Sequence, residues 1–267
     1  MKLSVITINY NNLQGLADTI KSVESQSVRD FEWVVVDGAS TDGSRALLEE
    51  HRDNITSWVS EPDSGIYNAM NKGIRMSSGE YLLFLNSGDM FADDQVVAKV
   101  LSELTGEDFI FGNIYHSDKL GVKAFNEKYI KGRDMAFMLT TSSLPHQSTF
   151  IHRSVFDRYG FYREDLRIVS DWEKLMDVLV FRHGSFRYIP IVISIYDTGG
   201  ISSSNKKLYN NERRKVFNDW HFSKHYLEFF RENYEKISFL NNNKFLFGLF
   251  RLFYYFRPKT RDVQHDL

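Results

Sequence analysis

Three nearly unbroken apolar stretches in the first ninety residues constrain the fold of this chain more than any other feature. They cover residues 3–8, 33–36 and 81–85 and are rich in valine, isoleucine and leucine. Strands that are apolar at consecutive positions are typical of parallel sheets covered by helices on both faces. Apolar residues at helical spacing lie between them, over residues 13–23 and 66–76. The sequence therefore predicts a doubly wound α/β fold with a mostly parallel sheet flanked by helices.

A cluster of polar residues follows each of these stretches, at residues 9–12, 37–42 and 86–89. In open α/β sheets the ligand crevice lies outside the carboxyl ends of the strands. We therefore expect the three clusters to converge on one crevice.

The segments after residue 105 are shorter and predict a second half of the same domain. The domain is expected to span residues 1–204, with halves at 1–105 and 106–204, and residues 205–267 predict a C-terminal amphipathic helical extension. The expected elements of the second half are strands at 109–113, 122–125 and 148–152, a helix at 171–181 and a strand pair around 186–196.

The composition excludes several classes of protein. With 42% hydrophobic and 25% charged residues, the chain has the composition of a folded domain. The absence of cysteine excludes a disulfide framework and a cysteine nucleophile. A net charge of −2 argues against a nucleic-acid partner, which normally requires a basic face. We see neither a signal-peptide pattern nor an apolar run of roughly 20 residues, so we expect a cytoplasmic protein without a membrane span.

Two residues of the first two clusters suit a planar base. Asp37 ends a predicted buried strand, where a carboxylate requires hydrogen-bond donors. A nucleobase N–H is one such donor, and the backbone amides of an Asx turn or helix cap are the alternative. Tyr10 follows the first strand and fits either a stacking position or an ordinary half-buried tyrosine.

Two further groups suit a diphosphate and a cation. Asn68, Asn71 and Lys72 lie near a predicted helix start, which suits a pyrophosphate but is equally consistent with a solvated helix face. Residues 86–89 read Asn-Ser-Gly-Asp, and Asp89 beside an asparagine carbonyl offers hard oxygen ligands for Mg²⁺ or Mn²⁺. A plain turn explains the same four residues.

The second half holds one candidate base. Ser170 and Glu173 have the spacing of a capping box, which leaves Asp171 available as a carboxylate base or as a charge that complements the helix dipole. His146 lies in a polar turn, and Gly199 and Gly200 predict a flexible loop. Neither feature is diagnostic alone.

In this order and spacing, the motifs resemble the nucleotide-sugar-binding half of family-two glycosyltransferases, which have the Rossmann-like GT-A fold. The resemblance is ordered over about residues 3–100, extends to about residue 204, and looks like the bacterial branch that builds surface polysaccharides. The matching motifs are VITINYN (5–11), VVVDGASTD (34–42), AMNKGI (69–74), SGEY (78–81), NSGD (86–89), HQSTF (146–150), VSDWE (169–173) and GGIS (199–202).

The resemblance implies roles for these residues. It implies that residues 1–105 bind the nucleotide sugar and that residues 106–204 hold the acceptor and the catalytic base. The nucleotide-sugar contacts would be Thr7, Tyr10, Asp37, Asn68, Asn71, Lys72, Asn86 and Ser87. Asp89 matches the metal-binding carboxylate, Asp171 matches the base of inverting members, and His146, Gly199 and Gly200 would serve the acceptor or its loop.

The chain departs from the family pattern at two places. The usual aspartate-x-aspartate motif is reduced to one carboxylate at Asp89, and Gly38 replaces the second aspartate of the common pair after strand two. A non-catalytic membrane-surface or assembly protein with the GT-A fold is therefore the alternative hypothesis. A nicotinamide dehydrogenase is disfavoured because no Gly-x-Gly-x-x-Gly follows the first strand.

The function expected is inverting transfer of a sugar, with a UDP-sugar favoured, to a hydroxyl of a growing glycan, with Mn²⁺ or Mg²⁺ at Asp89. Residues 241–261 are basic and aromatic, without an acidic residue. Such a segment suits an anionic membrane interface, and packing on the core or a second subunit is the alternative. Because resembling enzymes often use polyprenyl-linked acceptors, we expect peripheral association with the inner face of the cell membrane.

Overall fold

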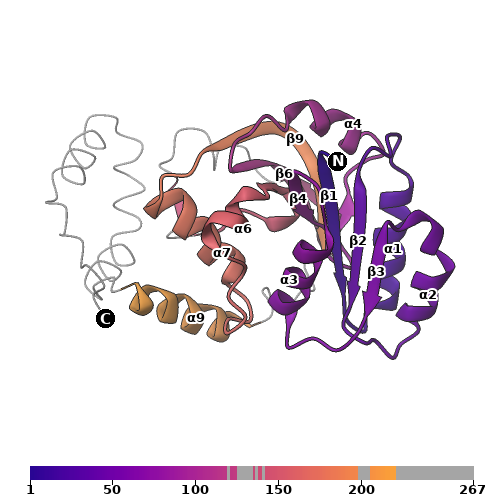
Figure 1. Ribbon diagram of the computed structural model, residues 1–267, viewed down its shortest axis with the longest axis horizontal. Coiled ribbons are helices and arrows are strands. Elements are labelled where there is room, and N and C mark those ends of the chain that lie inside the picture. The colour runs from indigo at the N-terminus through magenta and orange to yellow at the C-terminus, as the bar shows by residue number, and fades with distance from the viewer. Residues whose placement is uncertain (119–120, 125–134, 136–137, 140–141, 198–204, 221–267) are drawn as a thin grey trace, which may run out of the picture. The chain divides into compact units, whose positions relative to one another are not determined.

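The computed structural model describes residues 1–118, 121–124, 135, 138–139, 142–197 and 205–220 (Figure 1). Over these residues, nine strands form one sheet in the order β3-β2-β1-β4-β8-β6-β9-β5, and β7 pairs with β6. The strands are β1 (Leu3–Asn9), β2 (Glu32–Asp37), β3 (Ser57–Ser60), β4 (Tyr81–Phe84), β5 (Met90–Phe91), β6 (Phe109–Asp118), β7 (Gly121–Ala124), β8 (Thr149–His152) and β9 (Phe186–Asp197). The α-helices are α1 (Leu13–Glu24), α2 (Ser44–Glu50), α3 (Ile66–Met76), α4 (Val96–Val100), α6 (Ser154–Tyr159), α7 (Ser170–Leu175) and α9 (Lys206–Asp219). The other helical turns are η1 (Arg52–Asn54), η2 (Leu101–Glu103), η4 (His146–Ser148) and η5 (Met176–Phe181).

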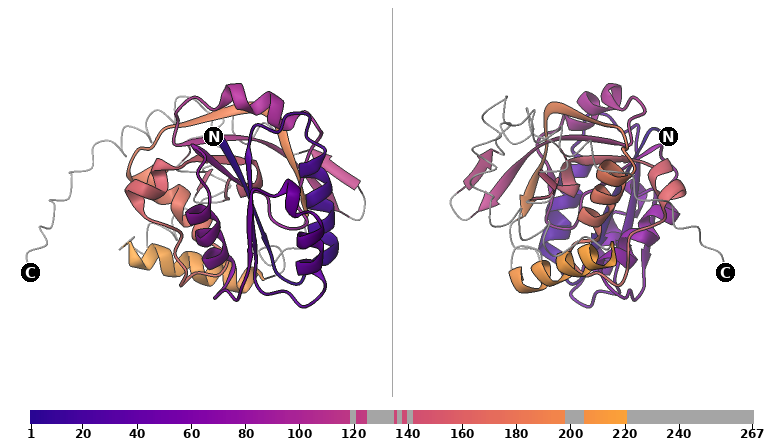
Figure 2. Two further views of the ribbon diagram at one scale, coloured as in Figure 1. Left: turned by 45° about the vertical axis from the view of Figure 1, so that its right-hand side comes forward. Right: turned by 90° about the vertical axis from the view of Figure 1, so that its left-hand side faces the viewer.

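The N-terminal half has the predicted parallel α/β arrangement. β1 pairs in parallel with β2 and β4, and β2 pairs in parallel with β3. Helices α1 and α2 lie on one side of these strands and α3 lies on the other (Figures 1 and 2). Alternate residues of β1 point to opposite faces: Val5 packs in the core with Leu16 of α1, whereas Ile6 faces α3. A Cβ atom at Gly73 would stand 2.4 Å from Ile6 Cγ2, so α3 lies directly against the sheet.

The second half of the sheet is mixed, whereas β1 to β4 of the N-terminal half are parallel throughout. β8 is antiparallel to both β4 and β6, and β5 is antiparallel to β9, whereas β6 and β9 run parallel. β8 lies next to β4 in the sheet and runs in the opposite direction. An antiparallel neighbour does not need the helical crossover that connects two parallel strands. The apolar runs alone do not distinguish these two directions.

The segment around residues 186–196 forms one strand, β9, instead of the expected strand pair. Its pairing with β6 shifts register, because Tyr188 lies opposite Phe111 whereas Val192 lies opposite Asn113. Pro190 falls within this bulge, where its missing N–H breaks no regular ladder. Pro190 is therefore accommodated inside a single long strand.

The chain divides into two compact units, Met1–Arg214 and Lys215–Leu267, ten residues beyond the expected boundary at 204. The first turns of α9 belong to the first unit because the buried Glu212 carboxylate accepts hydrogen bonds from the backbone N–H groups of Arg167 and Ile168, at 2.7 and 2.9 Å. The start of the predicted extension is therefore part of the α/β domain.

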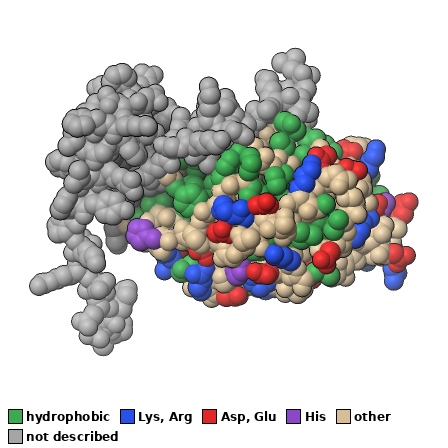
Figure 3. Space-filling model, turned by 90° about the horizontal axis from the view of Figure 1, so that it is seen from above, with side chains coloured by type: hydrophobic (Ala, Val, Ile, Leu, Met, Phe, Trp, Pro, Cys, Tyr) green, Lys and Arg blue, Asp and Glu red, His purple; other side chains and the backbone are tan. Residues whose placement is uncertain are grey.

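Among the described residues, none of the helices combines the length and apolar character that crossing a bilayer requires. Acidic and basic side chains are interspersed over the face shown in Figure 3. The basic aromatic segment at 241–261 lies outside the described residues, as do Gly199 and Gly200.

Candidate active site

The ends of β1 and β2 are joined through the Asp37 carboxylate. Its Oδ1 accepts hydrogen bonds from Asn9 Nδ2 at 2.8 Å and Ser40 Oγ at 2.5 Å. Its Oδ2 accepts from Ser60 Oγ at 2.6 Å and from the Ser40 backbone N–H at 3.0 Å. Burial by itself raises the pKa of Asp37, but the hydrogen bonds from Ser40, Ser60 and Asn9 outweigh burial and lower it. Asp37 is therefore a charged carboxylate held by protein donors.

This arrangement does not support the prediction that Asp37 accepts a hydrogen bond from a base. The residue has no exposed surface, and each of its oxygens already has two donors. The alternative, an Asx turn that shapes the β2–α2 loop, matches the observed geometry.

The Thr7 side chain lies in the core, and its predicted nucleotide contact stays a prediction. Its side chain is fully buried, and its hydroxyl accepts a hydrogen bond from the indole N–H of Trp33 at 3.1 Å. A position in the middle of β1 places Thr7 in the core, two residues before the strand end.

The Tyr10 ring is 68% exposed at the carboxyl end of β1. A Cβ atom at Gly38 would stand 3.0 Å from Tyr10 Cδ2 and 2.5 Å from Asp63 Oδ2. The other Asp63 oxygen accepts from Gly65 N–H at 3.0 Å. Gly38 thus leaves room for a carboxylate that arrives from the β3–α3 loop, beside an exposed aromatic ring.

The α3 residues expected at a diphosphate have protein partners instead. Asn71 is buried, donates to Tyr162 O and accepts from Tyr162 N–H, at 2.9 and 3.0 Å. Lys72 Nζ lies 2.8 Å from Glu61 Oε1 and donates to Pro62 O at 2.7 Å. A diphosphate contact by Asn71 or Lys72 stays a prediction, and both side chains already have protein partners.

Asn68 takes part in the same interface. Its Nδ2 donates to Glu164 Oε2 at 2.8 Å, and Asn71 Nδ2 donates to Glu164 Oε1 at 2.8 Å. These contacts tie α3 to the loop that precedes α7. The asparagines of α3 thus place the second half of the domain against the first.

The turn after β4 supplies an acidic and an amide side chain. Asp89 is 5% exposed, and its Oδ1 accepts from Gln147 Nε2 at 3.5 Å. Asn86 Oδ1 is buried and has no hydrogen-bond partner among the residues that the structure describes. Asn12 Nδ2 donates to both Ser87 O and Ser87 Oγ, at 3.1 and 3.3 Å, which ties this turn to the end of β1.

Asp171 lies at the start of α7 and is linked to this turn through His146. Its Oδ1 accepts from the Tyr67 hydroxyl at 2.7 Å, and its Oδ2 lies 3.4 Å from His146 Nδ1. His146 Nε2 in turn lies 3.0 Å from Asn86 Nδ2. A continuous chain of polar contacts therefore runs from α3 through Asp171 and His146 to the turn after β4.

The charges along this series of polar contacts stabilise one another. Burial by itself raises the pKa of Asp171, but the hydrogen bond and charge of His146, with the Tyr67 hydroxyl, lower it. Burial lowers the pKa of His146, but the hydrogen bond and charge of Asp171 and the charge of Asp89 outweigh it and raise it. Burial, followed by the Asp171 charge, raises the pKa of Tyr67 well above its usual value, so Tyr67 stays a donor. Asp171 is therefore held as a carboxylate.

The expected capping box at α7 does not form. Val169 is the N-cap, and Ser170 Oγ accepts from the Arg163 backbone N–H at 2.6 Å. Ser170 is fully buried, so its hydroxyl is committed to the preceding loop. Asp171 keeps its place in the first turn, where the helix dipole also favours a negative charge.

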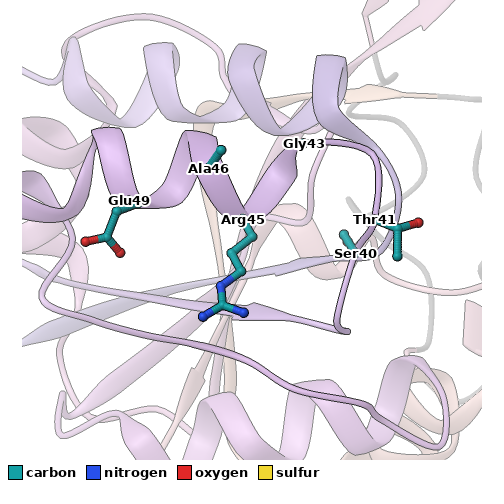
Figure 4. Close-up of a pocket in the computed structure, with 6 residues that line it drawn as sticks. All are labelled: Ser40, Thr41, Gly43, Arg45, Ala46 and Glu49. Carbon is teal, nitrogen blue, oxygen red and sulfur yellow. The ribbon is translucent and has the colours of Figure 1, made fainter.

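The strand-end clusters lie together, as expected. Asn9 bonds to Asp37, Asn12 bonds to Ser87, and the chain through His146 joins Asn86 to Asp171. An open cavity of about 550 Å³ lies along α2 (Figure 4), and neither Asp37, Asp89 nor Asp171 lines it. Its lining residues are Ser40, Thr41, Gly43, Arg45, Ala46 and Glu49.

Comparison with known protein families shows where the chain belongs. The family described as Glycosyl transferase family 2 matches residues 4–160, more than half of the chain. The chain belongs to glycosyltransferase family 2. A Mycobacterium tuberculosis protein named as an uncharacterized glycosyltransferase is 34% identical to this glycosyltransferase over 228 residues, which is 81% of this chain and 80% of the relative. A PGL/p-HBAD biosynthesis glycosyltransferase of the same species is 27% identical over 210 residues, 75% of this chain and 79% of the relative.

Solved structures show the same fold at low sequence identity. Staphylococcus aureus TarS 1–349 in complex with UDP-GlcNAc aligns with a TM-score of 0.63 and 18% identity, over 76% of this glycosyltransferase. The chain spans only 61% of that TarS structure. The Pyrobaculum calidifontis mannosyltransferase PcManGT, in complex with GDP-Man and Mn²⁺, aligns with a TM-score of 0.61 and 17% identity, over 85% of this chain and 70% of that one.

Sequence reasoning missed two residues of the site. Tyr67 is 104 positions from Asp171 and occupies an apolar position of α3, so no local pattern links them. Asp63 lies in a turn-forming segment, and the only sequence signal for its position is Gly38, whose missing side chain leaves room for the Asp63 carboxylate.

Proposed function

We propose that this glycosyltransferase moves a sugar from a nucleotide-diphosphate sugar to an acceptor hydroxyl with inversion at the anomeric carbon. The observation that carries the proposal is the series of contacts that links Asp171 through His146 to the turn holding Asn86 and Asp89. A base and a leaving-group site on opposite sides of one space are what a single displacement requires. The UDP, UDP-GlcNAc and GDP-Man complexes of the structural neighbours support the donor class.

The donor base is proposed to stack on Tyr10 and to donate an N–H to Asp63. Tyr10 is the exposed aromatic ring at the strand ends, and an Asp63 oxygen lies beside it. A carboxylate accepts from the imide N–H of uracil and also from the paired N–H groups of guanine. We favour UDP-sugars, and the test below includes GDP-sugars as the alternative.

The turn after β4 fits a divalent cation shared with the donor. Asn86 Oδ1 is a buried oxygen without a partner among the described residues, and Asp89 lies in the same turn. The described residues contain no cluster of three or more acidic, histidine or cysteine side chains that would hold a metal ion alone. Mg²⁺ and Mn²⁺ suit such a site because they retain waters and share phosphate oxygens. When bound, the cation would neutralise charge on the departing diphosphate.

In the proposed transfer step, Asp171 is the only protein group that takes up a proton. The acceptor oxygen forms a bond to the anomeric carbon while the bond from that carbon to the diphosphate oxygen breaks. The acceptor hydroxyl proton passes to an Asp171 oxygen. His146 and Tyr67 hold that carboxylate from its other sides, and no covalent sugar–enzyme intermediate forms.

The acceptor is proposed to be a growing, lipid-linked surface glycan. The relative named for PGL/p-HBAD biosynthesis and a Bacillus subtilis relative named for teichuronic acid biosynthesis support this class. We propose that residues 241–261 bring the enzyme to the inner face of the cell membrane, where polyprenyl-linked acceptors reside.

Thermal shift tests the donor proposal. A UDP-sugar at about 100 times its Kd should raise the Tm by about 5 °C, and more with Mn²⁺ than without. Tyr10→Ala should remove most of the shift, whereas Leu13→Ala, another exposed apolar side chain, should retain it. GDP-sugars serve as the second arm. If no nucleotide sugar shifts the Tm with either cation, the chain is instead a non-catalytic protein on this fold.

A further inference from the structure

We propose that His146 is a positioning residue that holds the Asp171 carboxylate in the orientation needed for proton transfer and couples it to the donor-side turn. This inference rests on the proposed function. It assigns to His146 a role in the chemical step rather than in acceptor contact.

Both nitrogens of the His146 ring face polar groups on opposite sides of the site. Nδ1 lies 3.4 Å from Asp171 Oδ2, and Nε2 lies 3.0 Å from Asn86 Nδ2. The ring is largely buried, with 22% of its side chain exposed. It is therefore the single side chain, among those described, that touches both the proposed base and the turn proposed to hold the cation.

The backbone beneath the ring is fixed. Ser148 N–H and Thr149 Oγ1 both donate to Pro145 O, at 3.1 and 2.7 Å. These bonds close the η4 turn immediately before β8, which pairs with β4. His146 thus projects from a rigid turn on the central sheet, which suits a residue that must hold another in place.

The geometry of the carboxylate explains why a second donor is needed. Tyr67 alone would leave Asp171 able to rotate about its χ2 bond. With Tyr67 on Oδ1 and His146 on Oδ2, the carboxylate plane is fixed. Each carboxylate oxygen accepts about two hydrogen bonds, and the Trp172 backbone N–H takes a third of these four places, so one remains for the acceptor hydroxyl. A displacement of about 1 Å at a reacting group can cost about 100-fold in rate.

Three substitutions separate the two contacts of the ring. In His146→Asn the side-chain amide N–H takes the place of Nδ1 and keeps the contact to Asp171. In His146→Gln the side-chain amide oxygen takes the place of Nε2, accepts from Asn86 Nδ2 and keeps only that contact. His146→Leu removes both. His152→Leu is the matched control, because His152 also lies near a carboxylate, Glu80, but at the opposite end of β4 from Asn86.

The assay is release of nucleoside diphosphate from the sugar nucleotide with the largest thermal shift, with Mn²⁺ and with water as acceptor. His146→Leu and His146→Gln should each lower kcat by about 100-fold, with donor KM unchanged within about threefold. His146→Asn should recover kcat to within about tenfold of the wild type. His152→Leu should match the wild type.

Different results overturn different claims. A wild-type kcat in His146→Leu overturns the positioning role, as does equal loss of kcat and Tm in the Asn, Gln and Leu variants, which would show a purely structural role. If the wild type releases no nucleoside diphosphate, or Asp171→Asn releases it at the wild-type rate, the proposed function fails and the inference falls with it.

Discussion

Asp171→Asn should lower the rate of sugar transfer by about 10²- to 10⁴-fold while leaving donor binding intact. The amide has nearly the same shape as the carboxylate and can still accept from Tyr67 through its oxygen. It cannot take a proton from the acceptor hydroxyl. The measurement is kcat for nucleoside diphosphate release, together with the donor-induced shift in Tm.

Asp165→Asn is the control for this substitution. Asp165 lies six residues before the proposed base, is half exposed, and pairs with Arg163 instead of His146. It should retain the wild-type kcat. Transfer by Asp171→Asn at the wild-type rate would show that another group takes the proton.

Asp37→Ala should lower the free energy of unfolding by about 3 kcal/mol, because it removes a buried acceptor from three side-chain donors. Ser40, Ser60 and Asn9 would each lose their partner at the ends of β1, β2 and β3. Urea unfolding measures the loss. Asp53→Ala, which changes a side chain that is 99% exposed, should leave stability unchanged.

The same residue predicts a pH dependence. Because the pKa of Asp37 is lower in the folded protein than in the unfolded chain, its stabilisation is present above the ordinary aspartate pKa of about 4 and is lost as pH falls through the folded value. The free energy of unfolding should therefore decrease as pH is lowered from about 5, and decrease less steeply in Asp37→Ala. An identical slope in the two proteins would contradict the assignment of a buried, charged Asp37.

The parallel half of the fold could be predicted because its strands are buried on both faces, and burial leaves a direct mark on sequence. The positions of Tyr10 after β1, Asp89 in the turn after β4 and Asp171 at the start of α7 could also be predicted, from the pattern of strands and helices. The antiparallel addition of β8 could not be predicted in this way, since a buried strand has the same apolar pattern in either direction.

Three of the predicted ligand contacts fall on side chains that already have protein partners. Asn71 and Lys72 have side chains that suit a diphosphate, but each is occupied by a partner in a loop whose approach the local sequence does not specify. Thr7 has its hydroxyl paired with an indole in the core. A polar side chain near a strand end binds a ligand only if the fold leaves its hydrogen bonds unfilled.

The anomeric configuration of the released sugar tests the central claim most directly. The account describes one displacement, with Asp171 as base and no covalent intermediate. Proton NMR of the donor reaction, followed before the free sugar equilibrates, should first show the anomer opposite in configuration to the donor. Initial release of the anomer with the donor's own configuration would contradict the account, because retention requires a second displacement.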